Sequence, residues 1–221
     1  MPKLHPTTRD NFLWLLIALV ALLFSSALFD QLFDGAGARI VNLSITTTLL
    51  VAVWSLDHRR RRHLSRFGIS IVLLAIAIGD ILLVNAELNS IILLLILLFL
   101  CSTIVIAARQ VLFTGNIDGN KIVGAIVIYL LIGLSWAFVY LLVEELFPGS
   151  INGLNHASWQ DNLDTVIYYS FVTLTALGYG DITPAMPLSR FLAYTEAVVG
   201  QFYLAILVAS LIGARLRSKK T

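Results

Sequence analysis

The sequence predicts an all-α membrane protein with six transmembrane helices and one short re-entrant helix between the last two. The chain of 221 residues is 58% hydrophobic and only 13% charged, whereas soluble domains carry roughly 25% charged residues. Its mean hydropathy of +0.89 is too high for one water-soluble core, because surface positions need polar side chains. Apolar runs of membrane-spanning length also recur along the chain. We therefore expect an integral membrane protein.

Six apolar runs approach the length of about 20 residues that a helix needs to cross a bilayer. They lie at about 12–29, 40–56, 67–84, 90–108, 122–143 and 191–213. The first run is too long for a removable signal peptide and lacks a small-residue cleavage site. The runs divide the chain into a four-helix transmembrane domain (1–109), a cytoplasmic linker (110–121), a second membrane domain (122–214) and a basic cytoplasmic tail (215–221).

The positive charges predict the orientation of these spans. If the N-terminus is cytoplasmic and six spans alternate, 13 of the 15 Lys and Arg residues face the cytoplasm, and only Arg39 and Arg190 lie outside. The positive-inside rule favours this arrangement, with both termini cytoplasmic in a multi-pass protein of the cell membrane. The stretch DHRRRRHLSR (57–66) could bind nucleic acid, but its place in a short loop between two spans favours anionic lipid headgroups. We expect membrane lipids as partners and no nucleic acid.

Residues that would carry enzyme or metal chemistry are few and scattered. Cys101 is the single cysteine and lies in an apolar run, so neither an intrachain disulfide nor a cysteine zinc site is expected. The four histidines show no ligand spacing, and the chain has no phosphate-binding, metalloprotease or nucleophile-elbow motif. We expect no enzymatic activity and no cofactor.

The segment between the last two spans, 144–190, is too long for a simple turn. FPGSINGLNHAS (147–158) reads as an exposed loop. WQDNLDTVIYYSFVTLT (159–175) predicts a helix of roughly three to four turns, with Ser158 and Asp161 spaced as a capping box. Pro184 and Pro187 exclude continuation of that helix. The chain is therefore expected to enter the membrane as a short helix and to leave it by a non-helical path.

TALGYGD (175–181) follows this short helix directly. Non-helical backbone is tolerated at membrane depth only where protein buries it or where it lines a water-filled path. Gly178 and Gly180 can adopt positive φ at no steric cost, and such alternation turns successive carbonyls to the same side. A row of carbonyls repeated around a symmetry axis can replace the hydration shell of a monovalent cation.

The stretch Thr175 to Asp181 resembles the pore signature of tetrameric potassium channels, Thr-Thr-Val-Gly-Tyr-Gly-Asp, at five of seven positions. GYGD alone is a weak signal, but its place after a short helix and between the last two spans makes it specific. The order of outer helix, pore helix, filter and inner helix, over about 122–214, resembles small prokaryotic ion-channel-2-type proteins. The resemblance implies passive K⁺ conduction by a homotetramer, because one loop cannot encircle an ion, and it makes 122–214 the pore domain.

The resemblance also implies the roles of individual residues. The selectivity filter would consist of Thr175, Ala176, Leu177, Gly178, Tyr179 and Gly180. K⁺ would bind the backbone carbonyls of Ala176, Leu177, Gly178 and Tyr179. The threonine that the family has at position 176 supplies a hydroxyl to the innermost ion site. Since alanine lacks this hydroxyl, we expect a weakened or hydrated innermost site.

Acidic residues are the expected supports of the filter. Asp181 is either a solvated loop acid or, by the resemblance, a hydrogen-bond partner of Tyr168 on the pore helix. Glu196 lies inside the last span, where a carboxylate is costly and usually faces a partner or water. We expect it to bond to the pore helix near Ser170 or Thr173, or to titrate and tune gating. Four further acids, Glu144, Glu145, Asp161 and Asp164, either raise the cation concentration at the mouth or are ordinary solvated residues.

The last span carries the expected gate. Gly200 matches the hinge glycine of the family's inner helix, although close helix packing would also explain it. Gln201, Leu204, Val208 and Ile212 follow helical spacing on one face. By the resemblance this face lines the cavity, and its apolar part would close by dewetting. The alternative is that the stripe packs against protein or meets lipid.

Two rival functions stay open at this point. The filter changes at Ala176 and Leu177 are compatible with a weakly selective monovalent cation channel. A non-conducting membrane or transporter subunit is the other rival, although coupled carriers usually show internal repeats with interrupted helices, and none is seen. The fourth apolar run has no basic residue before Arg109, so voltage sensing by an Arg-rich fourth helix is not expected.

Overall fold

The computed structural model describes residues 11–32, 89–112, 119–154 and 158–218. The spans predicted at about 40–56 and 67–84, and the basic stretch 57–66, lie outside the described residues. The described elements, in chain order, are α1 (Asn11–Leu32), α4 (Asn89–Leu112), α5 (Gly119–Leu146), β1 (Ile151–Asn152), α6 (Leu163–Leu174), β2 (Thr183–Pro184) and α7 (Pro187–Ser218). The chain is mostly helical, as expected, and four helices coincide with four of the six predicted spans.

The helix lengths separate spanning helices from the short one. By length and composition, Asn89–Val111 and Gly119–Leu146 can cross a membrane. α6 has only 12 residues, which at 1.5 Å per residue gives roughly 18 Å, well short of a hydrocarbon core of about 30 Å. The prediction of a short helix between two long ones is therefore confirmed, while the total of six transmembrane helices stays a prediction.

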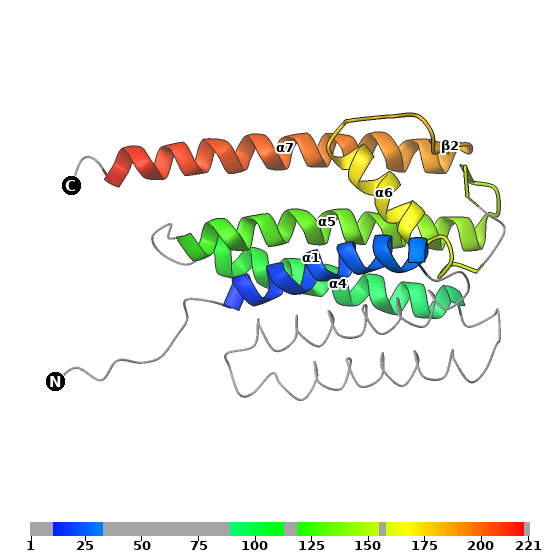
Figure 1. The fold of residues 1–221 in the computed structure, drawn as a ribbon. Helices are drawn as coiled ribbons and strands as arrows, with labels where there is room; N and C mark the ends of the chain where they lie inside the picture. Colours follow the sequence, from blue (N-terminus) through cyan, green and yellow to red (C-terminus); the bar gives the residue numbers. More distant parts are fainter. Residues whose placement is uncertain (1–10, 33–88, 113–118, 155–157, 219–221) are drawn as a thin grey trace.

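α5 is the central helix of the described bundle. α1, α4, α5 and α7 run lengthwise, and α6 lies obliquely between α5 and α7 near one end (Figure 1). α5 contacts α1, α4, α6 and α7. Its buried residues lie on every side of the helix rather than on one stripe, which is the pattern of a helix enclosed by others.

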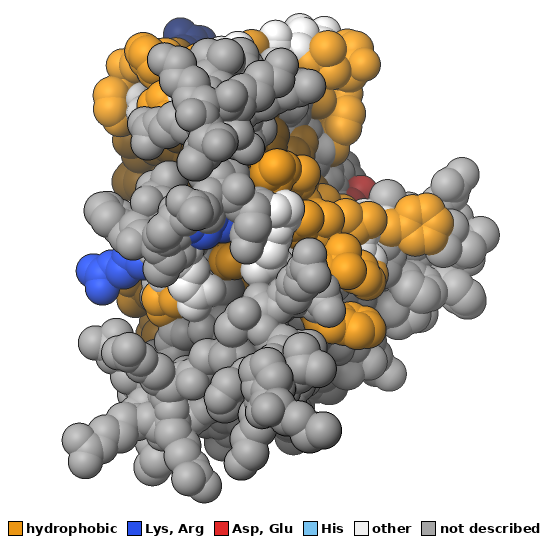
Figure 2. Space-filling view, turned by 90° about the vertical axis from the view of Figure 1, so that its left-hand side faces the viewer, with side chains coloured by type: hydrophobic (Ala, Val, Ile, Leu, Met, Phe, Trp, Pro, Cys, Tyr) orange, Lys and Arg blue, Asp and Glu red, His pale blue; other side chains and the backbone are white. Residues whose placement is uncertain are grey.

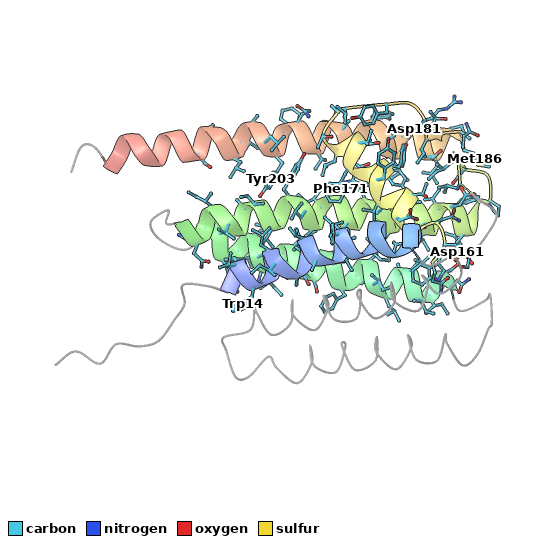
Figure 3. The ribbon with its side chains drawn as sticks, viewed as in Figure 1. Trp14, Asp161, Phe171, Asp181, Met186 and Tyr203 are labelled. Carbon is cyan, nitrogen blue, oxygen red and sulfur yellow. The ribbon has the colours of Figure 1, made fainter. Side chains whose placement is uncertain are left out.

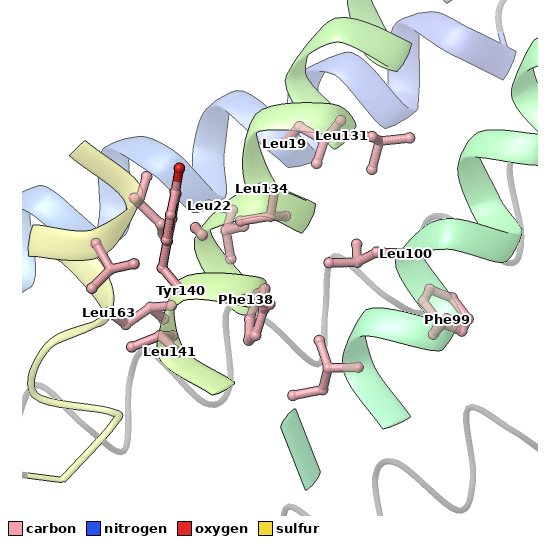
Figure 4. Packing of buried hydrophobic residues seen from close by; sticks show 14 of the residues in the cluster. Leu19, Leu22, Phe99, Leu100, Leu131, Leu134, Phe138, Tyr140, Leu141 and Leu163 are labelled. Carbon is pink, nitrogen blue, oxygen red and sulfur yellow. The ribbon is translucent and has the colours of Figure 1, made fainter. Parts of the chain in front are cut away.

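The apolar core gathers around α5 (Figure 4). Leu131, Leu134 and Phe138 of α5 belong to the same buried cluster as Leu19 of α1 and Leu100 of α4. The outer faces of the bundle are also apolar, because the exposed side chains include Trp14, Ile17, Phe24, Ile91 and Leu98. On the face shown in Figure 2, most described side chains are hydrophobic. Apolar exposure on this scale fits contact with lipid better than contact with water.

A two-residue antiparallel strand pair, β1 and β2, was not predicted. Ile151 pairs with Pro184 and Asn152 with Thr183. Ser150 extends the connection, since its carbonyl accepts from Ala185 N at 2.8 Å and from Ser189 Oγ at 2.7 Å. The loop before α6 and the loop before α7 are thereby joined, and the two ends of the segment that carries TALGYGD are fixed to each other.

The predicted start of the short helix was wrong, whereas the last helix contains its predicted span. α6 begins at Leu163, with Asn162 at the N-cap position and no side-chain cap. The Ser158 hydroxyl donates instead to the Asp161 carboxylate at 2.7 Å, within a turn before the helix, so the capping box does not form. α7 begins at Pro187, about four residues before the predicted span. Proline suits the first helical position, because the missing N–H has no partner inside the helix there.

Candidate functional site

The sign of the backbone angle φ alternates from Thr175 to Gly180. φ is +57° at Ala176, +61° at Gly178 and +80° at Gly180, while Leu177 and Tyr179 have negative φ. Every second residue is therefore left-handed. Positive φ was expected at the two glycines, whereas Ala176 was not expected to share it. Alternation of hand turns successive peptide groups to one side, which is the backbone geometry that a row of carbonyls requires.

Ala176 holds this conformation against a steric cost, which is roughly 1–2 kcal/mol for a residue with a Cβ. Its N–H donates to Thr173 O at 2.9 Å, and Leu177 N donates to Val172 O at 2.9 Å. The last carbonyls of α6, which lack partners inside the helix, thus fix the first turn of the segment. The Thr175 hydroxyl donates to Phe171 O at 2.7 Å. This bond holds the Thr175 side chain against the last turn of α6.

The outer part of the segment is tied to α6 by Asp181, near the loop end of the bundle (Figure 3). The expected hydrogen bond is present: Tyr168 OH lies 2.7 Å from Asp181 Oδ2, and Ile182 N donates to Oδ1 at 3.0 Å. The donated bond from Tyr168 holds the pKa of Asp181 below its usual value. The Tyr168 ring also stacks on Tyr179, with centroids 6.4 Å apart and planes 7° apart. Tyr168 thus supports the segment through both its ring and its hydroxyl.

The helix that precedes the segment, α6, is bonded to Glu196 of α7. Glu196 is fully buried, and its carboxyl oxygens lie 2.5 Å from Ser170 Oγ and 2.6 Å from Tyr140 OH. The carboxyl group therefore joins α5, α6 and α7. Ser170 was one of the two expected partners, and Thr173 is not bonded to Glu196. Tyr140 was missed, although a tyrosine within an apolar span is a detectable signal because its hydroxyl needs a partner.

Gly200, one turn after Glu196, lies against the end of α6. A Cβ at this position would stand 2.0 Å from Leu174 O and 2.9 Å from the Leu174 carbonyl carbon. The structure thus supports the packing explanation of this glycine, and a hinge role stays untested. Gln201 Nε2 lies 3.4 Å from Thr175 O, a long contact. Leu204 is partly exposed at 36%. The side chains of Val208 and Ile212 lie outside the described ones.

The four acids expected at the mouth have interactions within the chain. Glu144 accepts from Gly149 N at 2.7 Å, Ser150 Oγ at 2.8 Å and Ile151 N at 3.0 Å, so it organises the turn after α5. Glu145 accepts from Asn89 at 3.2 Å, and Asp161 accepts from Ser158. Asp164 lies in the first turn of α6, where a negative charge is favoured by the helix dipole. Asp161 and Asp181 lie at the same end of the bundle (Figure 3), so this end carries negative charge.

The candidate site is open in a single chain. Leu177 is 56% and Tyr179 66% exposed, although one face of the Tyr179 ring stacks on Tyr168. The adjacent face of α7 is equally uncovered, and its exposed apolar residues include Phe191, Tyr194, Phe202 and Ile206. A groove along this face is lined by Ala197, Val198, Gln201, Phe202 and Ala205. Within the described ranges, no group of three or more His, Cys, Asp or Glu residues could hold a metal ion.

Comparison with known proteins agrees with this geometry. Residues 124–216 match the model of a protein family described as ion channel, and this range extends from the second turn of α5 to the last turn of α7. Protein LctB of Bacillus caldotenax is 30% identical over 83 residues, which cover 36% of this chain and 61% of LctB. The match thus spans less than two thirds of that relative. No solved structure matches the chain. The family match supports an ion-channel assignment for the segment that contains α5, α6 and α7, and with the apolar helices it supports a membrane protein.

Proposed function

We propose that the chain is the subunit of a homotetrameric potassium-selective channel, in which residues 175–180 of four copies form the filter. K⁺ would move passively through this pore in the cell membrane, with both chain termini cytoplasmic and without an Arg-rich voltage-sensing helix. The observation that carries the proposal is the alternating hand of residues 176–180 directly after a helix too short to cross the membrane.

The ion coordination follows from that backbone. Carbonyls of Ala176, Leu177, Gly178 and Tyr179 from four subunits would replace the hydration shell of K⁺, as in filters built from carbonyl rings. Tyr168 and Asp181 would hold the outer part of each strand, and Ser170 and Glu196 would hold the pore helix from the inner side.

The surfaces that stay exposed in a single chain support a tetramer. One segment contributes one side of a passage, so the carbonyl row needs symmetry-related copies to enclose an ion. One face of α7, with Phe191, Tyr194, Phe202 and Ile206, is apolar and exposed in a single chain. A closed symmetric oligomer buries the same patch on every subunit and leaves no open contact. Four copies accord with the resemblance of TALGYGD to tetrameric pores.

A weakly selective monovalent cation channel is the second candidate. It is favoured by one observation: Ala176, at the inner end of the proposed filter, has no hydroxyl. The innermost ion site would then lack the side-chain oxygens that a threonine supplies, and water would complete the coordination.

The test is ion flux through the purified full chain in liposomes. Gradients of K⁺ and of Na⁺, applied separately, should show K⁺ flux well above Na⁺ flux. The filter is probed by Gly180→Ala, because Gly180 has φ +80° and no atom within 4 Å of an added Cβ. Its matched control is Gly149→Ala, because Gly149 has φ +81° and equally free space, but lies in the loop after α5.

The two variants should lose similar stability, because both place a Cβ in the left-handed region. Only Gly180→Ala should abolish or alter the flux. Equal K⁺ and Na⁺ fluxes in the unmodified protein would contradict the potassium-selective channel and support the weakly selective one. Absence of flux from a monodisperse tetramer, at any voltage, would favour a non-conducting subunit. Equal loss of flux in the two variants would contradict the proposal that Gly180 is part of the filter.

A further inference from the structure

We propose that Glu196 is a neutral carboxylic acid at physiological pH and donates its proton to Ser170, as the central link of a directed hydrogen-bond chain. The chain runs from Tyr140 to Glu196, then to Ser170, and ends at the carbonyl of Gly133. It begins and ends on α5 and passes through α7 and α6. Glu196 is thus a positioning residue for the helix that precedes the filter segment, and the inference concerns this fold whether or not the protein conducts.

The first argument is a count of protons. Three short oxygen–oxygen contacts form the chain: Tyr140 OH to Glu196 Oε2 at 2.6 Å, Glu196 Oε1 to Ser170 Oγ at 2.5 Å, and Ser170 Oγ to Gly133 O at 2.7 Å. Each contact needs one proton between its oxygens. Tyr140 and Ser170 carry one hydroxyl proton each, and the Gly133 carbonyl has none. Three contacts therefore require a third proton, and the Glu196 carboxyl is the group that can hold it.

The direction of each bond follows from the same count. The Gly133 carbonyl can only accept, so the Ser170 proton lies toward Gly133. The Ser170 oxygen then accepts, and the proton between it and Glu196 belongs to Oε1. Tyr140 donates to the remaining oxygen, Oε2. An ionised Glu196 would take the Ser170 proton and leave two oxygen atoms 2.7 Å apart with no proton between them.

The second argument is the environment of Glu196, which is fully buried. A buried carboxylate needs a cation or several donors to offset its lost hydration. Among the described residues, the groups that bond to Glu196 are the two hydroxyls of Tyr140 and Ser170. The titratable groups that face it are Tyr129 and Tyr140 from α5 and Tyr169 from α6. All three are neutral at physiological pH, and no Lys, Arg or His of the described chain forms an ion pair with Glu196.

The proposal predicts that α6 is held by a hydrogen bond that Glu196 donates. A glutamine side chain can donate this bond, whereas an ionised carboxylate cannot. In Glu196→Gln the amide NH₂ can donate to Ser170 while the amide oxygen accepts from Tyr140, so all three hydrogen bonds are kept. In Glu196→Ala both partners lose their bond in a buried place. Raising the pH should ionise Glu196, reverse the Ser170 bond and weaken the contact with α5, whereas the glutamine variant should not respond.

The decisive measurement is infrared difference spectroscopy of the full chain in detergent or lipid at neutral pH. The carbonyl stretch of a protonated carboxyl should be present in the unmodified protein and absent from Glu196→Gln. Ser170→Ala should shift this band, because the acceptor of the Glu196 proton is removed. Its matched control is Ser135→Ala, which removes a buried serine hydroxyl that bonds to its own helix at Leu131 O, 2.8 Å away, and should leave the band unchanged.

Thermal stability of the assembled protein is the second readout. Glu196→Gln should unfold at about the temperature of the unmodified protein and lack its loss of stability at alkaline pH, while Glu196→Ala should unfold at a lower temperature. A spectrum with no protonated carboxyl at neutral pH overturns the proposal even if every variant misfolds. A band that persists in Glu196→Gln, or that Ser135→Ala shifts as much as Ser170→Ala does, also overturns it. None of these results depends on ion flux, so failure of the channel proposal would be seen separately.

Discussion

Replacement of Gly200 by alanine should damage the contact between α7 and the pore helix more than any other glycine-to-alanine change in the helices described. The added Cβ would stand 2.0 Å from Leu174 O, whereas ordinary contact begins at 3.4 Å. The two backbones would have to separate by about 1.4 Å, because neither a carbonyl nor a helix backbone can rotate away as a side chain can. Leu174 is the last residue of α6, so the displacement would act directly on the start of the filter segment.

The cost can be bounded from the two effects that oppose each other. Overpacking of a tight site costs about 1–3 kcal/mol, and a rigid backbone neighbour places Gly200 in the upper part of this range. Alanine is favoured over glycine inside a helix by about 1 kcal/mol. The expected net loss is therefore about 1–2 kcal/mol per subunit, and it should be accompanied by altered ion flux.

A series of glycines supplies the controls. Gly119→Ala meets no atom within 4 Å and should be neutral or slightly stabilising. Gly133→Ala meets the Phe171 ring at 2.8 Å, and since a ring can shift, its loss should be smaller than that of Gly200→Ala. The assay is the temperature at which the detergent-solubilised protein ceases to be monodisperse, together with liposome flux. Unchanged thermal stability of Gly200→Ala with altered opening would refute the packing argument and favour a hinge.

Three further outcomes are expected. Tyr168→Phe keeps the ring stack but removes the bond to Asp181, so it should destabilise the filter segment. Because the pKa of Asp181 is lowered in the fold, the contribution of this bond is complete above the usual pKa of about 4 and is lost as pH falls through the lowered value. The difference between Tyr168→Phe and the unmodified protein in a thermal scan should vanish there, and a difference independent of pH would contradict the role of the carboxylate. Ala176→Thr should raise ion occupancy at the innermost site and K⁺ over Na⁺ selectivity, measured by ion density and reversal potential; equal occupancy in both proteins would contradict it. Glu144→Gln weakens three accepted bonds in the turn after α5 and should cost about 1–3 kcal/mol, measured as thermal stability, while retained stability would show that the turn does not need the carboxylate.

Composition and motif spacing predicted the local features of the fold, which depend on neighbouring residues along the sequence. Apolar runs require helices in a bilayer because each backbone group must find its partner within the segment. Glycine at 178 and 180 permits positive φ at those two positions. These features can be predicted without knowing which helices contact each other. The described structure has helices at four of the predicted spans and positive φ at both glycines.

Features that depend on contacts between distant residues were not predicted. The hydroxyl of Tyr140 meets Glu196 across 56 positions, and β1 meets β2 across more than 30. The positive φ of Ala176 was also not predicted, because it depends on hydrogen bonds from Ala176 N and Leu177 N to the last carbonyls of α6, which impose a conformation that alanine disfavours. The start of α6 was placed too early, because Ser158 found a partner in Asp161 rather than in the helix backbone.

The filter segment is held by two separate attachments that differ in chemistry. At the outer side, the exposed Tyr168 donates to an ionised Asp181, and this bond is open to changes of pH and salt. At the inner side, Ser170 and Leu174 of the pore helix meet Glu196 and Gly200, which are buried one turn apart on α7. The inner attachment is shielded from solvent and also includes Tyr140 and Gly133 of α5. Any movement of α7 must therefore either carry the pore helix with it or break the contact at Ser170, whereas the outer attachment can change while α7 stays in place. In the proposed channel, gating at the filter and gating by α7 would for this reason respond to different perturbations, the first to Tyr168→Phe and acid, the second to Gly200→Ala and Glu196→Ala.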